Sequence, residues 1–553
     1  MADRIQSYKV ICQGGLNSNE NHLELSEDTP GAGTRLVNYE VSLFGGYRRI
    51  EGFEEYDSDY PEVGVGQAEG KVLCVAIFKD DTTDENIVIA ARKDTSGNTY
   101  SFYRHVDGGG WTKYTLDHSI VRDTQDSNGR TVSKLRYQTF NFGDGNKIIF
   151  VDGVNPAIVF DGSHWDQITT DGDGTHSDSG SHAPGGPQAL DAPALVDVFE
   201  NHIFLGGDRT AQATIAHSAP NDPYDFTSAS GAGQISVGFD VVQFKPFRDD
   251  LFVFGGNGIK KISPDVTSGF VLDQVTTNVG CIARDSVLEL GGDLVFLAPD
   301  GIRPVAGTSR IGDVELETIS KSIQQLLVDL PRDYDLDTLN GLVIRSKSQL
   351  RYFIGDDGTN VTDSYGIIGG LRSADQRLGW EFGEVIGIRA SCCTSGYVGR
   401  EELVLHGDYD GKVYRQERGN TFNGNDILAV YQTPYYDFGD TEVRKTMRKV
   451  NTFIRAEGPL TVNMAVNYDW DDIATARPAS YSQESAGAPV RYKGRNINYS
   501  GVNINYGGNE KPIMTTSIQG SGYAVQLSFV TLGDFAPYSI QGIVFEFSVA
   551  GRR

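Results

Sequence analysis

Residues 250–262 read DLFVFGGNGIKKI, and this pattern decides the fold. An apolar run ends at Asn257-Gly258, and a second apolar run follows directly. Asn-Gly and Asp-Gly favour a β-hairpin because its turn needs positive φ, which Gly adopts freely and Asn or Asp tolerates. The stretch therefore predicts two antiparallel strands joined by a two-residue turn.

The same pattern recurs along the chain. Glycines 258, 301, 358 and 411 are separated by steps of 43, 57 and 53 residues, and Trp111 and Trp165 stand 54 residues apart. Periods of about 40–50 residues with several short strands each are typical of β-propeller blades. We therefore expect an all-β protein with a propeller over residues 61–427, of about seven blades, with six as the alternative. The other copies are KIIFVDGVNPAIVF (147–160), NHIFLGGDRTAQATIAHS (201–218), DLVFLAPDGIRPV (293–305), QLRYFIGDDGTN (349–360) and ELVLHGDYDGKVY (402–414).

Two segments interrupt the blade period. Residues 169–188 are polar and glycine-rich, which predicts a mobile loop without a core of its own. Residues 317–330 carry apolar side chains at helical spacing and precede Pro331, which predicts one helix that ends at this proline.

The hydrophobic pattern of the sequence changes after residue 428. Longer strands with alternating polarity predict a C-terminal antiparallel β-sandwich over residues 428–553, with a flat ribbon at 496–509, where NINY occurs twice. Residues 1–60 are expected to form an extended segment that packs on both domains.

The chain is strongly acidic, with a net charge of -26 from 48 Lys and Arg against 74 Asp and Glu. It should not hold nucleic acid through phosphate contacts, which need clustered cations, although a negative wall can enclose DNA without binding it. The odd number of cysteines, two of them adjacent, does not fit a secreted disulfide framework. MADRIQSYKV at the N-terminus lacks a signal-peptide core, so we expect folding in a reducing cytoplasm. The cysteines are Cys12, Cys74, Cys281, Cys392 and Cys393.

No motif predicts catalysis, a cofactor or a metal. GVGQAEGK (64–71) has its glycines too close for a phosphate loop and continues with Val72 where a hydroxyl is needed. VDGGGWTKYT resembles a sialidase-type box but lacks its upstream Ser, so a hairpin with a packed Trp is favoured. The Asp and His residues of 171–182 fit no calcium-loop spacing, and His202 and His217 are expected to be satisfied side chains of a blade.

The run VRKTMRKV (443–450) is the only cation cluster in the sequence. Its Arg444, Lys445, Arg448 and Lys449 predict either a strand that contacts a partner or DNA, or simply an exposed strand of the sandwich.

In the stretch IAHSAPNDPYDF (215–226), a short apolar strand ends at two prolines, and two aromatic residues follow. Pro220 and Pro223 remove backbone donors and fix φ, so the strand cannot continue. We expect a structural corner in which Tyr224 and Phe226 pack on a neighbouring blade, with a receptor-binding loop as the alternative.

Several stretches resemble the tail nozzle (tail-tube, or stabilisation) proteins of short-tailed double-stranded DNA bacteriophages. GGLNSNEN (14–21) and LVNYEVSLFGGYRRIEGFEEY (36–56) resemble their opening, in which a GLN segment precedes a G-x-x-R-R-x-x-G-F strand pair. IAHSAPNDPYDF is similar to their corner, and residues 247–262 and 278–305 are similar to their central blades. Residues 536–553 resemble their terminal strand, which ends in basic residues.

The resemblance implies a structural virion protein and not an enzyme. It implies a homo-oligomeric ring of six copies below the portal and the adaptor, around a channel that retains and then conducts the genomic DNA, with fibres or spikes docked outside. Synthesis would occur in the host cytoplasm, and the protein would end in the virion tail. The alternatives are a propeller glycan hydrolase or depolymerase on the same tail, and a non-viral scaffold propeller.

Overall fold

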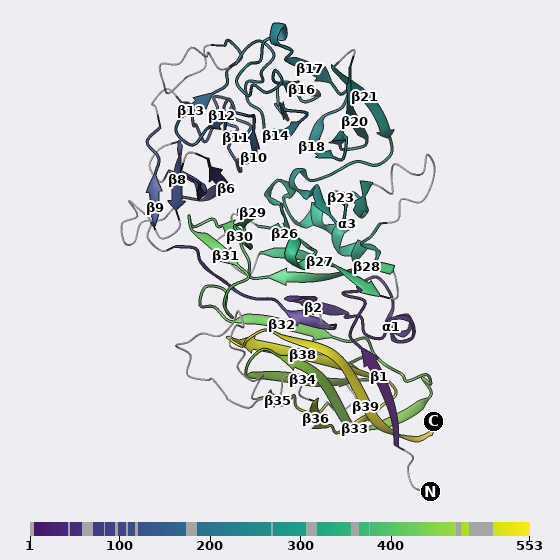
Figure 1. Ribbon diagram of the computed structural model, residues 1–553. Coiled ribbons are helices and arrows are strands. Elements are labelled where there is room, and N and C mark those ends of the chain that lie inside the picture. The colour runs from purple at the N-terminus through teal and green to yellow at the C-terminus, as the bar shows by residue number, and fades with distance from the viewer. Residues whose placement is uncertain are drawn as a thin grey trace.

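The structure, a computed structural model, consists almost entirely of β-strands in two stacked bodies (Figure 1). A β-propeller forms the upper body and an antiparallel β-sandwich forms the lower one, which confirms the predicted fold class. The structure describes residues 5–42, 45–57, 70–81, 83–94, 98–106, 109–116, 120–172, 185–266, 269–305, 318–355, 364–374, 377–471, 477–485 and 513–552.

Six sheets of three or four strands form separate blades of the propeller. The first two are β6 (Val72–Asp80), β7 (Glu85–Lys93), β8 (Tyr100–Val106) and β9 (Trp111–Lys113), then β10 (Arg136–Asn141), β11 (Asn146–Val151), β12 (Ile158–Phe160) and β13 (Trp165–Gln167). The next two are β14 (Leu195–Phe199), β15 (His202–Gly206), β16 (Thr214–His217) and β17 (Gly233–Ser236), then β18 (Val241–Phe247), β19 (Asp250–Gly255), β20 (Ile259–Asp265) and β21 (Gly269–Thr276). The last two are β22 (Leu288–Leu290), β23 (Asp293–Ala298) and β24 (Gly301–Pro304), then β29 (Cys392–Val398), β30 (Glu401–Gly407), β31 (Val413–Gln416) and β5 (Phe53–Glu55).

A further quartet of strands fills the remaining sector of the ring. Its first strand contacts β22 on one side and β29 on the other. The quartet also belongs to a nine-stranded sheet that continues into the sandwich, so the ring has six separate blades and a seventh, shared sector. Its strands are β25 (Asn340–Ile344), β26 (Gln349–Ile354), β27 (Tyr365–Ala374) and β28 (Arg377–Ile386).

Each copy of the hairpin pattern occupies the same place, the connection between the second and third strands of its sheet. The expected two-residue turn is wrong for most copies; among the copies whose turns the structure describes, only the one between β23 and β24 has two residues. In three of the longer turns an aspartate at the start, Asp152, Asp208 or Asp408, accepts two backbone N–H groups, as in an Asx turn. The Oδ1 atom of Asp152 accepts from the amides of Val154 and Asn155.

The N-terminal segment closes the propeller ring. β5 pairs with β31, with Phe53 opposite Gln416, so strands from the two ends of the propeller chain share one sheet. The ring of Phe53 stacks on Phe422 at a centroid distance of 5.1 Å and meets the edge of His406 at 4.9 Å. Burial of these rings therefore supports the closure.

Two sheets face each other in the sandwich. Val450, Ile454 and Phe545 of the first sheet share one apolar core with Met464 and Phe529 of the second. The first sheet contains β3 (Tyr39–Val41), β4 (Tyr47–Arg49), β39 (Tyr538–Arg552), β33 (Val443–Ala456) and β36 (Ile513–Ser517), with β1 (Ile5–Ile11) on β39 and β37 (Ser521–Gly522) on β33. The second contains β32 (Ile427–Gln432), β38 (Val525–Gly533), β34 (Leu460–Tyr468) and β35 (Tyr481–Ser485).

One short strand, β2 (Arg35–Val37), joins the two bodies. Val37 pairs in parallel with Glu384 of β28, and Leu36 pairs antiparallel with Tyr431 of β32. This strand makes the propeller quartet and the second sandwich sheet one continuous sheet. The helix α1 (His22–Asp28) precedes it and is capped by the side chain of Asn21.

The predicted helix is present, but its end differs from the expectation. α3 (Gln324–Asp333) follows a 3₁₀ turn, Lys321–Ile323, and it includes Pro331 in its last turn. A proline near the end of a helix removes only one internal hydrogen bond, so the helix runs two residues further before it stops. Of the predicted apolar face, Ile323, Leu327 and Leu330 are buried.

Several predicted segments fall outside the described residues. These are residues 173–184 of the predicted loop, 64–69 of the phosphate-loop-like stretch and the ribbon at 496–509. The two described ends of the loop meet, since the amide of Gly186 donates to the carbonyl of Thr169 at 2.9 Å.

Replacement of Phe53 by Ala should lower the free energy of unfolding by about 3 kcal/mol, because it opens a cavity where β5 closes the ring. Urea unfolding followed by fluorescence measures the change. Phe453→Ala is the matched control, since Phe453 is 37 % exposed on the sandwich and Phe53 only 7 %. Equal losses in both variants would contradict the importance of the closure.

Candidate functional site

The innermost strands of the blades surround a central cavity of about 190 Å³. It is lined by charged and amide side chains, including Lys134, Arg136, Asp197, Lys245 and Asp285. Each of these residues comes from a different blade or connection, so only the closed ring brings them together. The centre of the propeller is therefore a sizeable polar hollow.

Asp285 is the centre of the charge pairs in this cavity. Its carboxylate accepts from Nζ of Lys134 at 2.8 Å and from Nε of Arg136 at 2.7 Å. Burial alone would raise the pKa of Asp285, but the two cations lower it well below its ordinary value. On the opposite wall Lys245 pairs with Asp197 at 2.8 Å. Asp285 is thus held as the ionised partner of two largely buried cations, which is a structural arrangement.

Three thiols, those of Cys74, Cys392 and Cys393, also line the cavity. Burial raises the pKa of Cys392 to about 11, which makes the thiol a poor nucleophile. All five cysteines of the chain are free, and none forms a disulfide.

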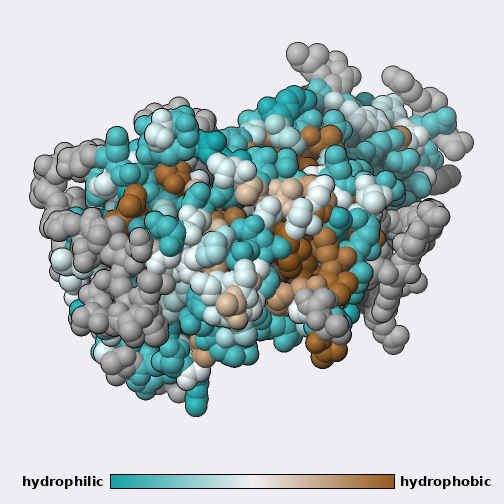
Figure 2. Space-filling model, turned by 90° about the horizontal axis from the view of Figure 1, so that it is seen from above, coloured by the Kyte–Doolittle hydropathy of each residue, from teal (hydrophilic) through white to brown (hydrophobic). Residues whose placement is uncertain are grey.

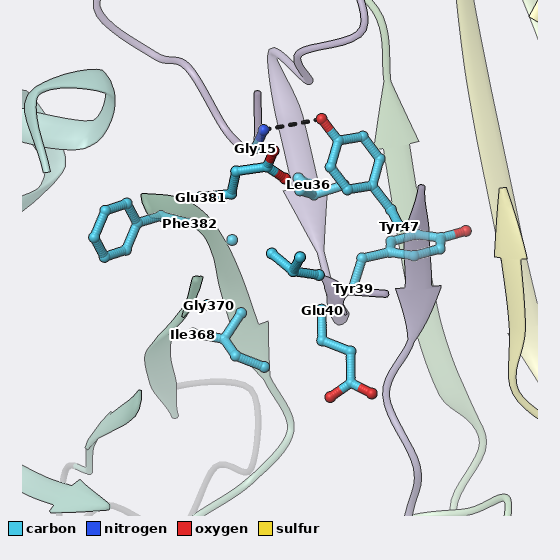
Figure 3. A pocket seen from close by; sticks show the side chains of 11 residues that line it. Gly15, Leu36, Tyr39, Glu40, Tyr47, Ile368, Gly370, Glu381 and Phe382 are labelled. Carbon is cyan, nitrogen blue, oxygen red and sulfur yellow. Dashed lines mark hydrogen bonds between the residues drawn. The ribbon is translucent and has the colours of Figure 1, made fainter. Parts of the chain in front are cut away.

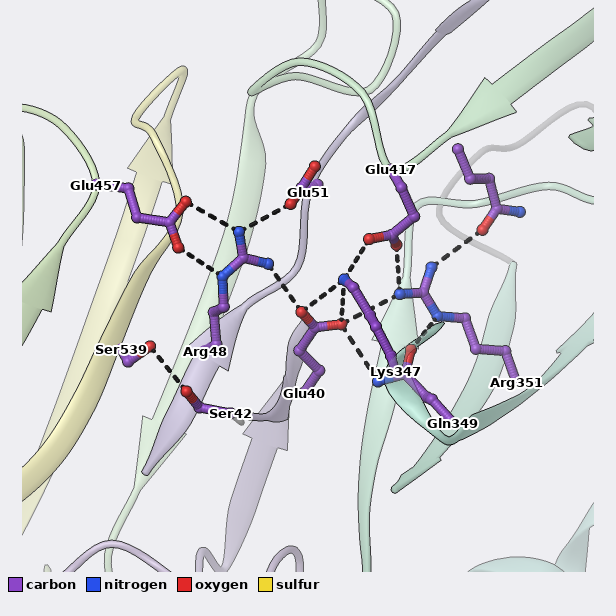
Figure 4. Close-up of polar contacts among 11 residues, drawn as sticks. Glu40, Ser42, Arg48, Glu51, Lys347, Gln349, Arg351, Glu417, Glu457 and Ser539 are labelled. Atoms are coloured by element: carbon purple, nitrogen blue, oxygen red, sulfur yellow. Dashed lines mark hydrogen bonds and ion pairs between the residues drawn. The ribbon is translucent and has the colours of Figure 1, made fainter. Parts of the chain in front are cut away.

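A second cluster of charges lies where the propeller meets the sandwich (Figure 4). Glu40 of β3 binds Arg48 of β4 and Lys347, each at 2.8 Å. Arg351 of β26, which is 1 % exposed, contacts Glu417 at 2.5 Å and Glu40 at 3.3 Å. We call Glu40, Arg48, Glu51, Lys347, Arg351, Glu417 and Glu457 the junction network.

The electrostatics of the junction network follow from its composition, with four carboxylates around three cations. Burial would raise the pKa of Glu417, but Arg351 and Lys347 outweigh it and hold the pKa well below its ordinary value. Burial and the nearby Glu417 raise the pKa of Glu51. Glu51 therefore takes up a proton more readily than an ordinary Glu, which relieves the excess negative charge, while Glu417 stays ionised.

Neighbouring residues complete the junction. Arg49 is fully buried and donates to the backbone carbonyls of Asn420 at 2.9 Å and Gly533 at 3.1 Å, one from each body. A small cavity of about 10 Å³, lined in part by Glu40 of the junction network, has room for about one water molecule (Figure 3). At its wall the amide of Gly15 donates to the hydroxyl of Tyr47 at 2.9 Å.

Sequence patterns missed both charge clusters. The run 443–450 stands out in the sequence because four of its eight residues are cations. The cations of the other two clusters come at most in loosely spaced pairs, and Lys245 lies far from Lys134 and Arg136, as Arg48 does from Lys347 and Arg351. The one local signal was the Arg48-Arg49 pair within an otherwise acidic and apolar stretch.

The four predicted contact residues of β33 do not share one environment. Lys445 is 2 % exposed and donates to the carbonyl of Tyr523 at 3.0 Å, so it belongs to the interior of the sandwich. A bulge between Met447 and Lys449 shifts the strand, and Arg448 and Lys449 both reach the outer face. Arg444 is also exposed. A partner contact by Arg444, Arg448 and Lys449 stays a prediction.

The corner at 215–226 lies between the second and third blades. Phe226 is fully buried in a core that includes Ile149 of β11, and Nζ of Lys147 lies 5.8 Å from the Tyr224 ring centre. The side chain of Asp222 accepts from the amide of Tyr224 at 2.9 Å. Pro223 is buried and Pro220 is exposed. The rings of Tyr224 and Phe226 therefore make the contact with the neighbouring blade, and Pro220 takes no part in it.

The two predicted blade histidines lie together. Their ring centres are 5.3 Å apart, and Nδ1 of His202 bonds to the carbonyl of Ser218 at 2.6 Å. Within the described ranges no group of three or more His, Cys, Asp or Glu side chains is arranged to hold a metal ion. In the same part of the chain no helix has the length and apolar character to cross a membrane.

Comparisons with known proteins add little. The chain matches no protein-family model and no curated protein. Among solved structures it is similar to Kluyveromyces lactis Hsv2, with 9% identity, a TM-score of 0.26 and coverage of 57% of this chain and 98% of that one. It is also similar to a glycoside hydrolase family 43 arabinoxylan arabinofuranohydrolase from Bacillus subtilis, with 9% identity, a TM-score of 0.24 and coverage of 89% and 98%. Scores this low carry no argument about function.

Replacement of Glu417 by Gln should lower the free energy of unfolding by about 3 kcal/mol at neutral pH, because it leaves buried cations short of a partner. The folded pKa lies below the unfolded value of about 4.3, so this stability is present above that pH and is lost as the pH falls through and below it. Urea unfolding should therefore show a smaller difference from wild type in acid.

Glu401→Gln is the control for this variant. Glu401 also pairs with two arginines, Arg415 and Arg418, but it is half exposed, so its loss should change little. A difference between wild type and Glu417→Gln that persists undiminished in acid would contradict the ionised state of Glu417.

The cysteines should react slowly with a thiol reagent at about pH 8, because burial raises the pKa of Cys12 to about 12 and of Cys281 to about 11. All five should react at once in denaturant. Fast labelling of the native chain would show that the propeller centre opens in solution.

Proposed function

We propose that this chain is a structural protein of a virion, the subunit of the tail nozzle of a short-tailed phage. Copies of the chain would form a ring around a channel that retains and then conducts DNA, with the adaptor above and fibres or spikes outside. The proposal rests on the resemblance of the sequence to nozzle proteins and on what the residues that carry it do in the fold.

One observation carries the proposal: the motif residues are the ones that join the two bodies. In the stretch 45–53, Arg48 enters the junction network, Arg49 binds carbonyls of both bodies, and Phe53 begins the strand that closes the ring. A Cβ at Gly52 would lie 2.0 Å from the carbonyl oxygen of Thr421, so only Gly fits this position. The resemblance thus concerns a whole architecture and not one local turn.

Rigidity between the bodies also supports the proposal. A ring subunit around pressurised DNA must transmit load without hinging, and a continuous nine-stranded sheet with buried ion pairs resists hinging. The net charge of -26 fits a channel that DNA passes without sticking. The face of the molecule seen from above is mostly hydrophilic, with apolar side chains concentrated in one area (Figure 2).

The outer face of the first sandwich sheet offers a surface for contact between copies. Ile11 and Phe453 both pair with Gly542, and Ile513 pairs with Phe453, which places three large apolar side chains in one row. They are 51 %, 37 % and 56 % exposed, respectively. A head-to-tail ring buries such a row against a different surface of the next copy.

Particles assembled with and without this chain test the proposal. We expect that heads formed in its absence lack the lower tail and lose their DNA, as seen by electron microscopy. Normal tails that retain DNA would overturn the nozzle assignment. Cleavage of host surface polysaccharide by the purified chain would favour a depolymerase, and absence of the chain from purified virions would favour a scaffold propeller.

Reversal of Arg444 and Arg448 to Glu should leave the fold intact, because both side chains are exposed, but should weaken attachment to the ring or the head. Attachment of the wild type should weaken with salt, since exposed charges are screened over about 8 Å at physiological ionic strength. Sedimentation of assembled particles measures it. Lys321→Glu, an exposed cation on the propeller side, is the control.

A further inference from the structure

A strained turn follows β34 in the sandwich. Asp469, Trp470 and Asp471 have φ values of 51°, 53° and 62°, so three consecutive residues other than Gly are left-handed. This conformation is unfavourable for such residues, because the Cβ approaches the following carbonyl oxygen. Strain of this kind persists only where the surroundings hold it, and it gathers at functional sites.

Specific hydrogen bonds hold this turn in place. The Oδ1 atom of Asp469 accepts from the amides of Tyr523 at 2.6 Å and Ala524 at 3.2 Å. Nη2 of Arg477 donates to the carbonyl of Asp471 at 2.7 Å. Hydrogen bonds therefore hold both ends of the turn, and Trp470 lies between them.

The strain places an indole at the surface. Trp470 is 46 % exposed, whereas Trp111 and Trp165 are each 4 % exposed and Trp380 stacks on Phe382 at 5.9 Å. Its ring leans on the buried ring of Tyr435, with centroids 5.9 Å apart at 35°, and Tyr435 meets His22 at 5.3 Å. The indole of Trp470 thus packs against the ring of Tyr435, while much of the indole stays in solvent.

The polar groups beside the indole form a neutral pair. Oδ1 of Asp471 lies 3.2 Å from Nη2 of Arg477, and the two side chains are 49 % and 42 % exposed. Because their charges compensate, this pair attracts neither an anion nor a cation strongly. It still offers both accepting oxygens and donating N–H groups.

We propose that Trp470, Asp471 and Arg477 form a binding site for one sugar ring of a neutral glycan. The C–H face of a pyranose packs on the negative face of an indole, and its hydroxyls both donate and accept hydrogen bonds. The acidity of the chain disfavours an anionic polysaccharide or a nucleic acid.

The site is independent of the ring proposed above. It requires only the sandwich turn and the two side chains beside it, so loss of glycan binding would not alter the assembly, and failure of assembly would not alter glycan binding.

Titration calorimetry of the full chain with maltohexaose, cellohexaose, xylohexaose and mannohexaose tests the site. We expect at least one of these neutral glycans to bind and to weaken at least tenfold in Trp470→Ala, about the contribution of one aromatic contact. Tyr397→Ala is the control, since Tyr397 is 53 % exposed on the propeller and should leave binding unchanged. A wild type that binds none of the four glycans, or binds equally in Trp470→Ala, overturns the proposal.

A second variant separates binding from folding. Glycine accepts positive φ without strain, so Trp470→Gly should abolish glycan binding and keep or raise the Tm. If this variant does not fold, Arg477→Ala, which changes an exposed side chain, should weaken the same glycan at least threefold. Binding of polygalacturonate or of hexa-arginine at Trp470 in preference to all four neutral glycans would also overturn the proposal.

Discussion

The three-residue strand β2 joins the propeller to the sandwich through backbone hydrogen bonds on both of its edges. A strand with partners on both edges cannot move relative to either without breaking hydrogen bonds, so propeller and sandwich share one mechanical frame. The ordinary contact between two domains is a patch of side chains that can slide. Here the contact is a β-ladder, and the core of buried apolar side chains runs from α3 and the blades into the sandwich without a break.

The junction network adds specificity to this frame. Buried ion pairs give little net stability, because desolvation of the charges offsets their attraction, but a misplaced partner is strongly unfavourable. Glu40 can satisfy Arg48, Lys347 and Arg351 only when β3, β4 and β26 are in their present positions. The network therefore penalises every other placement of the propeller on the sandwich more than it strengthens this one.

Sequence reasoning reached the propeller and the sandwich because their signals are local. Glycine turns near residues 153, 258, 301 and 411 recur with the blade period, and alternation marks the long strands of the sandwich. It could not foresee that Phe53 pairs beside Gln416 or that Val37 pairs with Glu384, since pairing between distant segments leaves no pattern in either. It also missed the interior position of Lys445, which alternates inward with Val443 and Met447, and the bulge after Met447, which brings Lys449 to the outer face beside Arg448. The strained turn at Trp470 has no sequence signature at all.

The closure of the ring by β5 has a consequence for how the chain folds as it is made. Glu55 leaves the ribosome long before Val413 begins the strand that β5 must join. At about 5–20 residues per second the first strand waits roughly 20 to 70 s for its partner. During that time the N-terminal strands present unpaired edges to solvent, where they are open to mispairing. The nascent chain is thus most vulnerable to aggregation in its N-terminal fifty residues, and a chaperone that shields them until the last strand, β39, emerges would raise the yield.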